Sequence, residues 1–266
     1  MICDTNWNIF LTFLVIILLA FHNAINKNHA GLFGERIYPK VNTDTNKIFK
    51  ISHIDDPPVY YVPELLTDEH IKYLLKQVGM SGYTPSPTKK YENQEETNEQ
   101  KNWRKSSTCF TPPEKMKIVT KYITECLFAD INYIQCETPQ ITKYTKHNYY
   151  KSHLDSFSEN ENQRIATVIV YLNDVIEGGN TTFQNIRWGD GELCEKLGSK
   201  DSKFISIKPN KGSSIIFFPS YTNKNTNKNQ IENLGWHSAE QVIKGEKHIM
   251  QIWIREKEFK LTDTEI

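Results

Sequence analysis

Short runs rich in β-branched and aromatic residues, separated by turn residues, fill the second half of the chain. The runs are ITKYTKHNYYKSHLD (141–155), RIATVIVYLND (164–174), FISIKP (204–209), GSSIIFFPS (212–220), WHSAEQVI (236–243) and KHIMQIWIRE (247–256). Short strands at regular spacing are typical of a β-sandwich or a jelly roll. We therefore expect a mainly β domain.

Helical patterns come before these strands. Thr67 is a typical N-cap residue, and Ile71, Leu74 and Leu75 follow it at helical spacing, which predicts a helix over residues 68–78 after a short strand. A second helix is expected over residues 113–129. The expected class is α+β, mainly β with N-terminal helices.

Two polar stretches interrupt this pattern. Residues 27–56 show little periodicity and are expected to be a stalk or linker, so that the domain covers residues 57–266. Residues 81–105 contain almost no aliphatic side chains, which predicts a mobile loop of the kind that often covers an enzyme site.

The N-terminus carries an apolar run of thirteen residues, 9–21. A bilayer span needs about 20 residues, so residues 1–26 are interpreted as a signal peptide or an uncleaved signal anchor; a buried helix is the alternative. Either signal implies the secretory pathway, such as the endoplasmic reticulum, with the membrane as a partner of this segment. Lys27, Arg36 and Lys40 follow the run, and this charge placement argues against a luminal domain.

Charge and cysteine content argue against two classes of partner, nucleic acids and zinc. The 32 basic and 32 acidic side chains balance, which gives no electrostatic reason to expect a nucleic-acid partner. No CxxC pair suggests zinc. Cys3 lies in the targeting segment, and the other cysteines are compatible with two disulfides or with none; these are Cys109, Cys126, Cys136 and Cys194.

The segment His153-Leu154-Asp155 carries the candidate chemistry. Residues i and i+2 of a strand point to the same face, so His153 and Asp155 present one imidazole and one carboxylate together. An iron-binding facial triad needs a second histidine from elsewhere in the fold. His237 is the best candidate because it lies on a predicted late strand, whereas the other histidines lie near the targeting segment, before the β region, beside His153 or at a turn.

Several spaced motifs resemble those of one family, the prolyl 4-hydroxylases of the collagen and plant cell-wall type, which are iron(II)- and 2-oxoglutarate-dependent dioxygenases. The resemblance covers nearly all of residues 57–256. The matching motifs are Tyr144, Tyr150, His153 and Asp155 at the family's intervals; RIATVIVYLNDVIEGGNTTF (164–183); ELCEKLG (192–198); SIKPNKGSSIIFF (206–218); and His237, Lys247 and Trp253.

The resemblance implies a double-stranded β-helix, or jelly roll, and a set of cofactors. His153, Asp155 and His237 would hold Fe(II). Lys247 and Tyr144, with Trp253, would hold 2-oxoglutarate, because a buried ammonium neutralises a carboxylate through charge-assisted hydrogen bonds. O2 and L-ascorbate complete the expected set.

The resemblance also implies a reaction and a substrate. Peptidyl proline in a proline-rich or collagen-like polypeptide would become 4-hydroxyproline, with release of succinate and CO2, and Tyr150 and Arg164 would contact that polypeptide. A disulfide-isomerase-type partner is a further expectation from the family. The alternatives are hydroxylation of another side chain, such as lysine, and a non-catalytic, membrane-anchored binding protein.

The chain departs from the family pattern at two places. Arg255 stands two residues after Trp253, where the family often has a histidine implicated in substrate handling. Glu240 stands in the segment where the family has a cysteine, so Cys194 lacks its usual partner. Neither change affects the expected iron or 2-oxoglutarate residues, and both leave the identity of the peptide open.

Overall fold

The computed structural model describes residues 35–44, 47–87, 102–156, 162–197 and 203–260. The predicted signal or anchor, residues 1–26, lies outside these ranges. Within them, no helix is long and apolar enough to cross a membrane. The described residues divide into two compact units, one that contains residues 35–37 and 222–229 and another that contains the described parts of residues 38–221 and 230–260.

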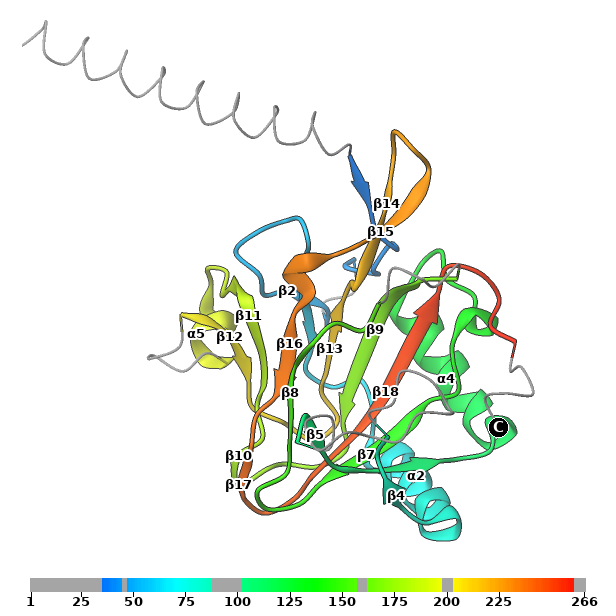
Figure 1. Cartoon of the computed structure of the whole chain (residues 1–266), viewed down its shortest axis with the longest axis vertical. Helices are drawn as coiled ribbons and strands as arrows, with labels where there is room; N and C mark the ends of the chain where they lie inside the picture. Colours follow the sequence, from blue (N-terminus) through cyan, green and yellow to red (C-terminus); the bar gives the residue numbers. More distant parts are fainter. Residues whose placement is uncertain (1–34, 45–46, 88–101, 157–161, 198–202, 261–266) are drawn as a thin grey trace, which may run out of the picture. The chain divides into compact units, whose positions relative to one another are not determined.

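The second unit is organised around an eight-stranded sheet (Figure 1). Its strands, in spatial order, are β2 (Phe49–Lys50), β3 (Tyr60–Val62), β13 (Ser214–Phe217), β9 (Arg164–Tyr171), β18 (Lys247–Arg255), β7 (Gln140–Tyr144), β6 (Ser107–Phe110) and β4 (Thr84–Pro85). All of the pairings along this order are antiparallel.

A five-stranded sheet forms the opposite layer. Its order is β12 (Phe204–Ile207), β11 (Thr181–Arg187), β16 (His237–Ala239), β8 (Tyr149–His153) and β5 (Arg104–Lys105). A two-stranded pair, β10 (Glu177–Gly178) with β17 (Val242–Lys244), completes this unit. Two facing antiparallel sheets with long connections are the expected jelly roll, which confirms the predicted fold class.

Alternation along the central strands explains how the large sheet is covered on both faces. On β9, Val168 and Val170 belong to one buried cluster, whereas Ile169 and Tyr171 belong to a second cluster shared with β11, β12 and β16. Successive side chains of a strand point to opposite faces, so a near-continuous apolar strand is buried on both sides. The second cluster is the core between the two sheets.

Two helices cover the other face of the large sheet. Helix α2 (Asp68–Ser81) buries Ile71 and Leu74, and helix α4 (Pro113–Leu127) buries Met116 and Ile123 against it. Thr67 caps α2, since its hydroxyl accepts a hydrogen bond from the His70 backbone N–H at 3.4 Å. Both predicted helices are therefore present, and α2 runs three residues beyond its predicted end. The smaller elements are η1 (Tyr133–Gln135), α5 (Glu192–Leu197) and η2 (Asn233–Gly235).

The structure corrects the expected linker over residues 27–56. Residues from Tyr38 onward belong to the same compact unit as the sheets, β2 pairs with β3, and Ile48 and Ile51 are buried in the core. The sequence signal was weak because the β2 strand is two residues long and both of its residues are exposed.

The expected mobile loop over residues 81–105 is also partly ordered. Its two ends form β4 and β5, which pair with β6 and β8. Residues 88–101, in its middle, lie outside the described ranges. The four cysteines for which disulfides were considered are free thiols.

The first unit contains most of a three-stranded sheet, in the order β1 (Arg36–Ile37), β14 (Ser220–Asn223) and β15 (Lys228–Ile231). Arg36 pairs with Asn223 and Ile37 with Thr222. Residues 223–230 are rich in Asn and Lys and resemble a surface loop in sequence, yet β15 begins within them.

Replacement of Gly178 tests the strained turn at the β10–β17 pair. Gly178 has φ of 73°, and an added Cβ would lie 2.4 Å from the Gln241 carbonyl oxygen. We expect Gly178→Ala to lower the free energy of unfolding by about 1–3 kcal/mol in urea denaturation. The matched control is Gly79→Ala in α2, where nothing lies within 4 Å of the new Cβ and a gain of about 0.5–1 kcal/mol is expected. Equal stability of the two variants would contradict the argument.

Candidate metal centre

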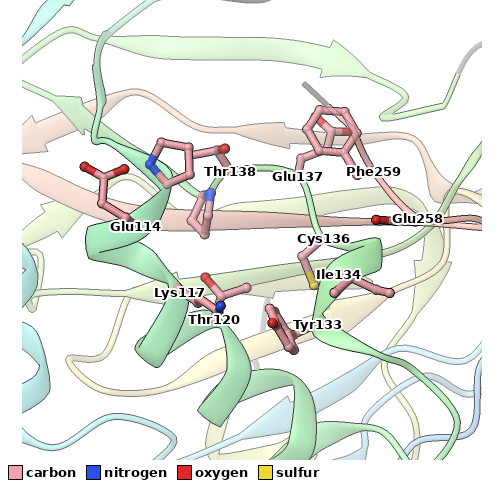
Figure 2. Close-up of a pocket in the computed structure, with 12 residues that line it drawn as sticks. Glu114, Lys117, Thr120, Tyr133, Ile134, Cys136, Glu137, Thr138, Glu258 and Phe259 are labelled. Atoms are coloured by element: carbon pink, nitrogen blue, oxygen red, sulfur yellow. The ribbon is translucent and has the colours of Figure 1, made fainter. Parts of the chain in front are cut away.

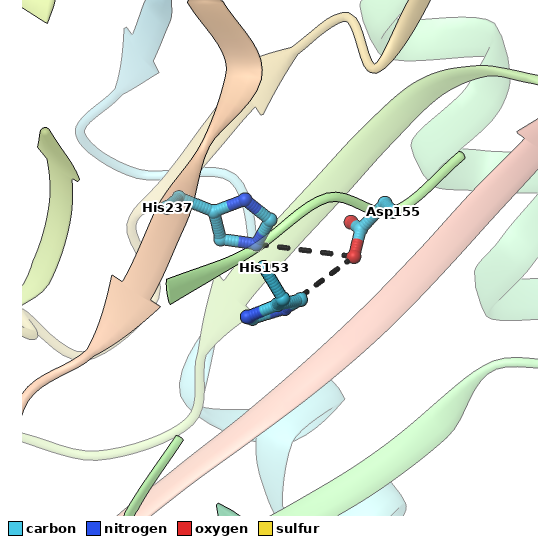
Figure 3. A group of neighbouring side chains, drawn as sticks. All are labelled: His153, Asp155 and His237. Atoms are coloured by element: carbon cyan, nitrogen blue, oxygen red, sulfur yellow. Dashed lines mark ion pairs between the residues drawn. The ribbon is translucent and has the colours of Figure 1, made fainter. Parts of the chain in front are cut away.

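Two histidines lie opposite each other on neighbouring strands. His153 ends β8, and His237 begins β16; the antiparallel register pairs these two residues directly. Their ring centroids are 4.3 Å apart. Asp155 follows two residues after His153, and its Oδ1 atom lies 3.6 Å from Nε2 of His153 and 3.9 Å from Nε2 of His237 (Figure 3). The structure thus brings together the three residues that the sequence analysis selected.

Backbone carbonyls orient both imidazole rings. Nδ1 of His153 lies 2.9 Å from the Lys151 carbonyl oxygen, and Nδ1 of His237 lies 3.0 Å from the Gly235 carbonyl oxygen. A carbonyl oxygen only accepts hydrogen bonds, so Nδ1 carries the proton in each ring and Nε2 keeps its lone pair. Both Nε2 atoms are buried and have no hydrogen-bond partner among the residues that the structure describes.

Two hydrogen bonds orient the Asp155 carboxylate through the oxygen that does not face the histidines. Its Oδ2 atom accepts a hydrogen bond from the Thr167 hydroxyl at 2.8 Å and another from the Trp253 indole N–H at 3.1 Å. Thr167 and Trp253 are directly paired across β9 and β18, which explains why both reach one oxygen. These two bonds leave Oδ1 directed at the histidines.

Burial and neighbouring charges fix the protonation states. Burial, with repulsion from His237, lowers the pKa of the His153 imidazole to about 3, so the ring is neutral at physiological pH. Burial opposes ionisation of Asp155, but the two histidines, Arg164 and the Thr167 hydrogen bond outweigh it and lower the carboxyl pKa. A neutral imidazole and an ionised carboxylate are the forms that bind metal.

The donor set fits a divalent iron ion. His153, Asp155 and His237 offer one ligand atom each, and these atoms all lie within 4.8 Å of one another. Two imidazole nitrogens and one carboxylate oxygen make the facial set of non-haem Fe(II) oxygenases. The two orphaned Nε2 atoms are the decisive observation, because buried polar atoms without partners are costly unless a ligand satisfies them.

Lys247 lies at the start of β18 and is 1% exposed. Its ammonium donates hydrogen bonds to the Gly179 carbonyl oxygen at 2.6 Å and to the Thr181 hydroxyl at 3.2 Å. Burial lowers the pKa of Lys247 to about 7, and the distant Glu240 only partly offsets this effect. No carboxylate forms an ion pair with this ammonium within the described residues, which suits it to bind an anion.

Two tyrosines surround the Lys247 ammonium. The Tyr144 ring, directly opposite on β7, and the Tyr171 ring have centroids 5.6 Å and 5.7 Å from Nζ. The Tyr171 hydroxyl donates to the Thr181 hydroxyl at 2.9 Å, so Thr181 links both groups. Tyr144 is 1% exposed, and burial raises its pKa, so it remains a neutral donor.

Tyr150, an expected substrate contact, stacks on the first histidine. Its ring lies 3.6 Å from the His153 ring, centroid to centroid, and the Arg104 guanidinium lies over the Tyr150 ring, 4.7 Å from its centroid. Burial raises the Tyr150 pKa to about 12. Arg104 comes from β5, at the end of the segment that the sequence analysis treated as a loop.

Arg164, the other expected substrate contact, already has a carboxylate partner. It binds Glu137 through two hydrogen bonds, from Nε at 2.6 Å and from Nη2 at 2.8 Å. Its guanidinium also lies 4.0 Å above the Trp253 ring. Trp253, which was predicted to contact 2-oxoglutarate, donates its indole N–H to Asp155. Both residues therefore support the metal ligand Asp155.

Sequence reasoning did not select several residues that complete the site. These are Arg104, Glu137, Thr167, Tyr171, Gly179 and Thr181. The strand register supplied a usable signal for Thr167 and Tyr171, since both lie on the core-facing side of β9.

A separate hollow of about 290 Å³ lies between α4, η1 and the residues after β18 (Figure 2). Tyr133, Ile134, Pro139 and Phe259 contribute to its walls, and none of the three candidate metal ligands does. Glu137 lines this hollow and also binds Arg164, which contacts Asp155.

Residues 139–255 match the family described as the 2OG-Fe(II) oxygenase superfamily, and the matched range contains all eight predicted site residues. This part of the chain is therefore similar to that superfamily. It is 34% identical over 126 residues to prolyl 4-hydroxylase 1 of Arabidopsis thaliana, covering 46% of this chain and 41% of that protein.

Two further relatives extend the comparison. A putative prolyl 4-hydroxylase of Acanthamoeba polyphaga mimivirus is 27% identical over 169 residues, covering 60% of this chain and 61% of that protein. The chain thus spans less than two thirds of either of these curated relatives. A viral collagen prolyl hydroxylase from Paramecium bursaria Chlorella virus 1, solved as a 2OG complex, shares the fold with a TM-score of 0.51 at 24% identity, covering 74% of this chain and 95% of that one.

Lys247→Met tests the cost of burying the ammonium. The unfolded pKa of lysine is about 10.4, so between pH 7 and about 10 the unfolded chain binds more protons than the folded one, and stability rises with pH. We expect Lys247→Met to be more stable than wild type by about 1–4 kcal/mol at pH 7 and below, with the difference shrinking towards pH 10. Urea denaturation at several pH values, without added 2-oxoglutarate, measures this.

The exposed Lys244 on β17 provides the matched control. Lys244→Met is expected to leave the pH dependence of unfolding as in wild type. A stability difference between Lys247→Met and wild type that stays constant from pH 6 to pH 10 would contradict the buried-ammonium argument.

Proposed function

We propose that the protein hydroxylates peptidyl proline to 4-hydroxyproline in a reaction that uses Fe(II), 2-oxoglutarate and O2 and releases succinate and CO2. The observation that carries the proposal is the cluster of His153, Asp155 and His237, with two buried Nε2 atoms that have no partner. The match of residues 139–255 to the 2OG-Fe(II) oxygenase superfamily and the names of the curated relatives support the reaction type.

His153, Asp155 and His237 would hold the iron, and Lys247 would hold the far carboxylate of 2-oxoglutarate. Together, bound iron and 2-oxoglutarate supply the oxidising chemistry that inserts oxygen into an unactivated C–H bond. The protein contributes orientation: carbonyls fix the imidazole tautomers, and Thr167 and Trp253 fix the carboxylate. These contacts keep the three ligand atoms converged before any ligand arrives.

The ammonium of Lys247 would gain from binding an anion. It is buried among the rings of Tyr144 and Tyr171, where its charged form is disfavoured. A carboxylate placed beside it would raise its pKa again and form charge-assisted hydrogen bonds. Tyr144 would add a neutral hydroxyl donor to the same group.

The proposed substrate is an extended, proline-rich or collagen-like polypeptide. Tyr150 and Arg104 form a stacked aromatic and cationic surface beside His153, and aromatic surfaces are common in the recognition of proline-rich segments. We assign the peptide contact to this pair and give Arg164 a supporting role, because Glu137 engages its guanidinium.

Hydroxylation of another peptidyl side chain, lysine for instance, is the second candidate, since the metal and 2-oxoglutarate residues do not discriminate between substrates. A non-catalytic, membrane-anchored binding protein is the third, although the orphaned Nε2 atoms favour a metal-binding role. L-ascorbate as a reductant, an endoplasmic-reticulum location with a single N-terminal membrane segment, and a disulfide-isomerase-type partner belong to the proposal as well.

Alanine substitution of each metal ligand tests the centre. We expect His153→Ala, Asp155→Ala and His237→Ala each to reduce 2-oxoglutarate turnover at least about 100-fold, because two remaining ligands hold iron poorly. Succinate release measures turnover. His147→Ala, at an exposed histidine six residues before His153, serves as the control and should retain activity. Wild-type turnover in any of the three ligand variants would refute the assigned triad.

A peptide panel tests the substrate. Purified protein with Fe(II), 2-oxoglutarate and ascorbate is expected to add 16 Da, the mass of one oxygen atom, to proline-rich peptides and to leave proline-free, lysine-containing peptides unchanged. Tandem mass spectrometry locates the oxygen. Oxygen found on lysine, with proline unmodified, would contradict proline hydroxylation and favour hydroxylation of lysine.

A further inference from the structure

A carboxylate shared by two arginines lies behind the candidate metal centre. Oε1 of Glu137 lies 2.6 Å from Nε of Arg164 and 2.6 Å from Nε of Arg255. Its Oε2 accepts a hydrogen bond from Nη2 of Arg164 at 2.8 Å. Glu137 and Arg255 are 9% and 8% exposed, so this ion-pair network is largely removed from solvent.

Strand register explains why the network needs a carboxylate. β9 and β18 pair with a register irregularity between Ile254 and Arg255, and this places Arg255 directly opposite Arg164. Like charges directly opposite each other on neighbouring strands are destabilising. Glu137, which follows η1, supplies the negative charge between the two guanidinium groups.

Arg164 connects this network to the candidate metal ligand Asp155 through two contacts. Its Nη1 atom donates to the Asp155 backbone carbonyl oxygen at 3.2 Å. Its guanidinium also covers the Trp253 ring, whose N–H holds Oδ2 of Asp155. The position of Arg164 therefore influences both the backbone and the carboxylate of Asp155.

Arg255 also fixes the strand ends on which Arg164 lies. Its Nη1 atom donates to the Asn162 carbonyl oxygen at 2.7 Å, and the following Glu256 backbone N–H donates to the Gln163 carbonyl oxygen at 2.9 Å. Asn162 and Gln163 immediately precede Arg164. Arg255 thus constrains Arg164 through the backbone as well as through Glu137.

We propose that Arg255 and Glu137 are positioning residues of the metal centre, which hold Arg164 so that Asp155 keeps the orientation needed for tight metal binding. The proposal rests on the metal site of the proposed function. It gives Arg255, at a position where related enzymes often carry histidine, a task in metal binding rather than in direct contact with peptide.

Co(II) binding tests the proposal without peptide turnover, because Co(II) accepts the ligands of Fe(II) and its visible absorption reports ligand geometry. Residues that orient a ligand through hydrogen bonds typically change metal affinity about 10–100-fold, and Arg255 lies one contact further away. We therefore expect Arg255→Gln to weaken Co(II) binding about 3- to 10-fold and to alter the Co(II) spectrum. Calorimetry gives the affinity.

Three further proteins complete the experiment. Arg255→Lys keeps the charge but loses the second donor group, so about twofold to threefold weaker binding is expected. Glu137→Gln should weaken Co(II) binding about 10-fold or more, since it leaves two buried arginines without a counter-charge. Arg187→Gln, at an exposed arginine on β11, is the control and should bind Co(II) like wild type.

Wild-type Co(II) affinity and spectrum in Arg255→Gln would overturn the proposal, even if the variant unfolds at a lower temperature. If Arg255→Gln does not fold, Arg255→Lys decides in the same way: values identical to wild type overturn the proposal, and weakened binding with an altered spectrum supports it. Failure of the proposed function gives a different result, because wild type and His153→Ala would then bind Co(II) equally weakly.

Discussion

The pairing of β8 with β16 puts His153 and His237 directly opposite each other, and the rest of the site is arranged around that register. A shift of one residue in either strand would turn one imidazole to the other face of the sheet. The same principle places Tyr144 opposite Lys247 and Thr167 opposite Trp253 on neighbouring pairs of strands. Three cross-strand pairs thus point into the core between the two sheets: one pair of candidate metal ligands, one pair suited to bind an anion, and one pair that orients the Asp155 carboxylate.

Removing the Asp155 carboxylate and the Lys247 ammonium from water costs free energy, and specific hydrogen bonds offset part of this cost. Asp155 is 3% exposed and uses its outer oxygen for two hydrogen bonds, and Lys247 is 1% exposed and donates to a carbonyl and a hydroxyl. Among the described residues, Nε2 of His153 and Nε2 of His237 have no hydrogen-bond partner, and the Lys247 ammonium has no ion-pair partner. A divalent cation would satisfy the two Nε2 atoms, and a dianionic cosubstrate would satisfy the ammonium. The candidate ligand positions are thus the places where these groups lack a partner within the protein.

Part of the fold and of the candidate site was predictable from the sequence, and part was not. The strands around residues 141–256 and both helices were predictable, because apolar and polar residues recur there at the periods of strands and helices. The edge strand β2 and the β5 segment were missed, since each is two residues long and neither carries a strong apolar pattern. Arg164 and Trp253 were predicted as site residues, but their contacts with Glu137 and Asp155 were not, because spacing along a chain does not show which partner a side chain meets.

The sequence by itself determined the residues with metal-binding and anion-binding chemistry, their faces on predicted strands and the mainly β class. The mainly β class and the strand faces depend on local periodicity, whereas Lys247 and Tyr144 were assigned because their intervals resemble those of a known family. Only the tertiary structure decided that Glu137 joins Arg164 to Arg255, that Thr167 and Trp253 share one oxygen of Asp155, and that Arg104 covers Tyr150. Those contacts join residues from separate strands and loops, and their geometry depends on register, bulges and sheet packing, which no short stretch of sequence encodes.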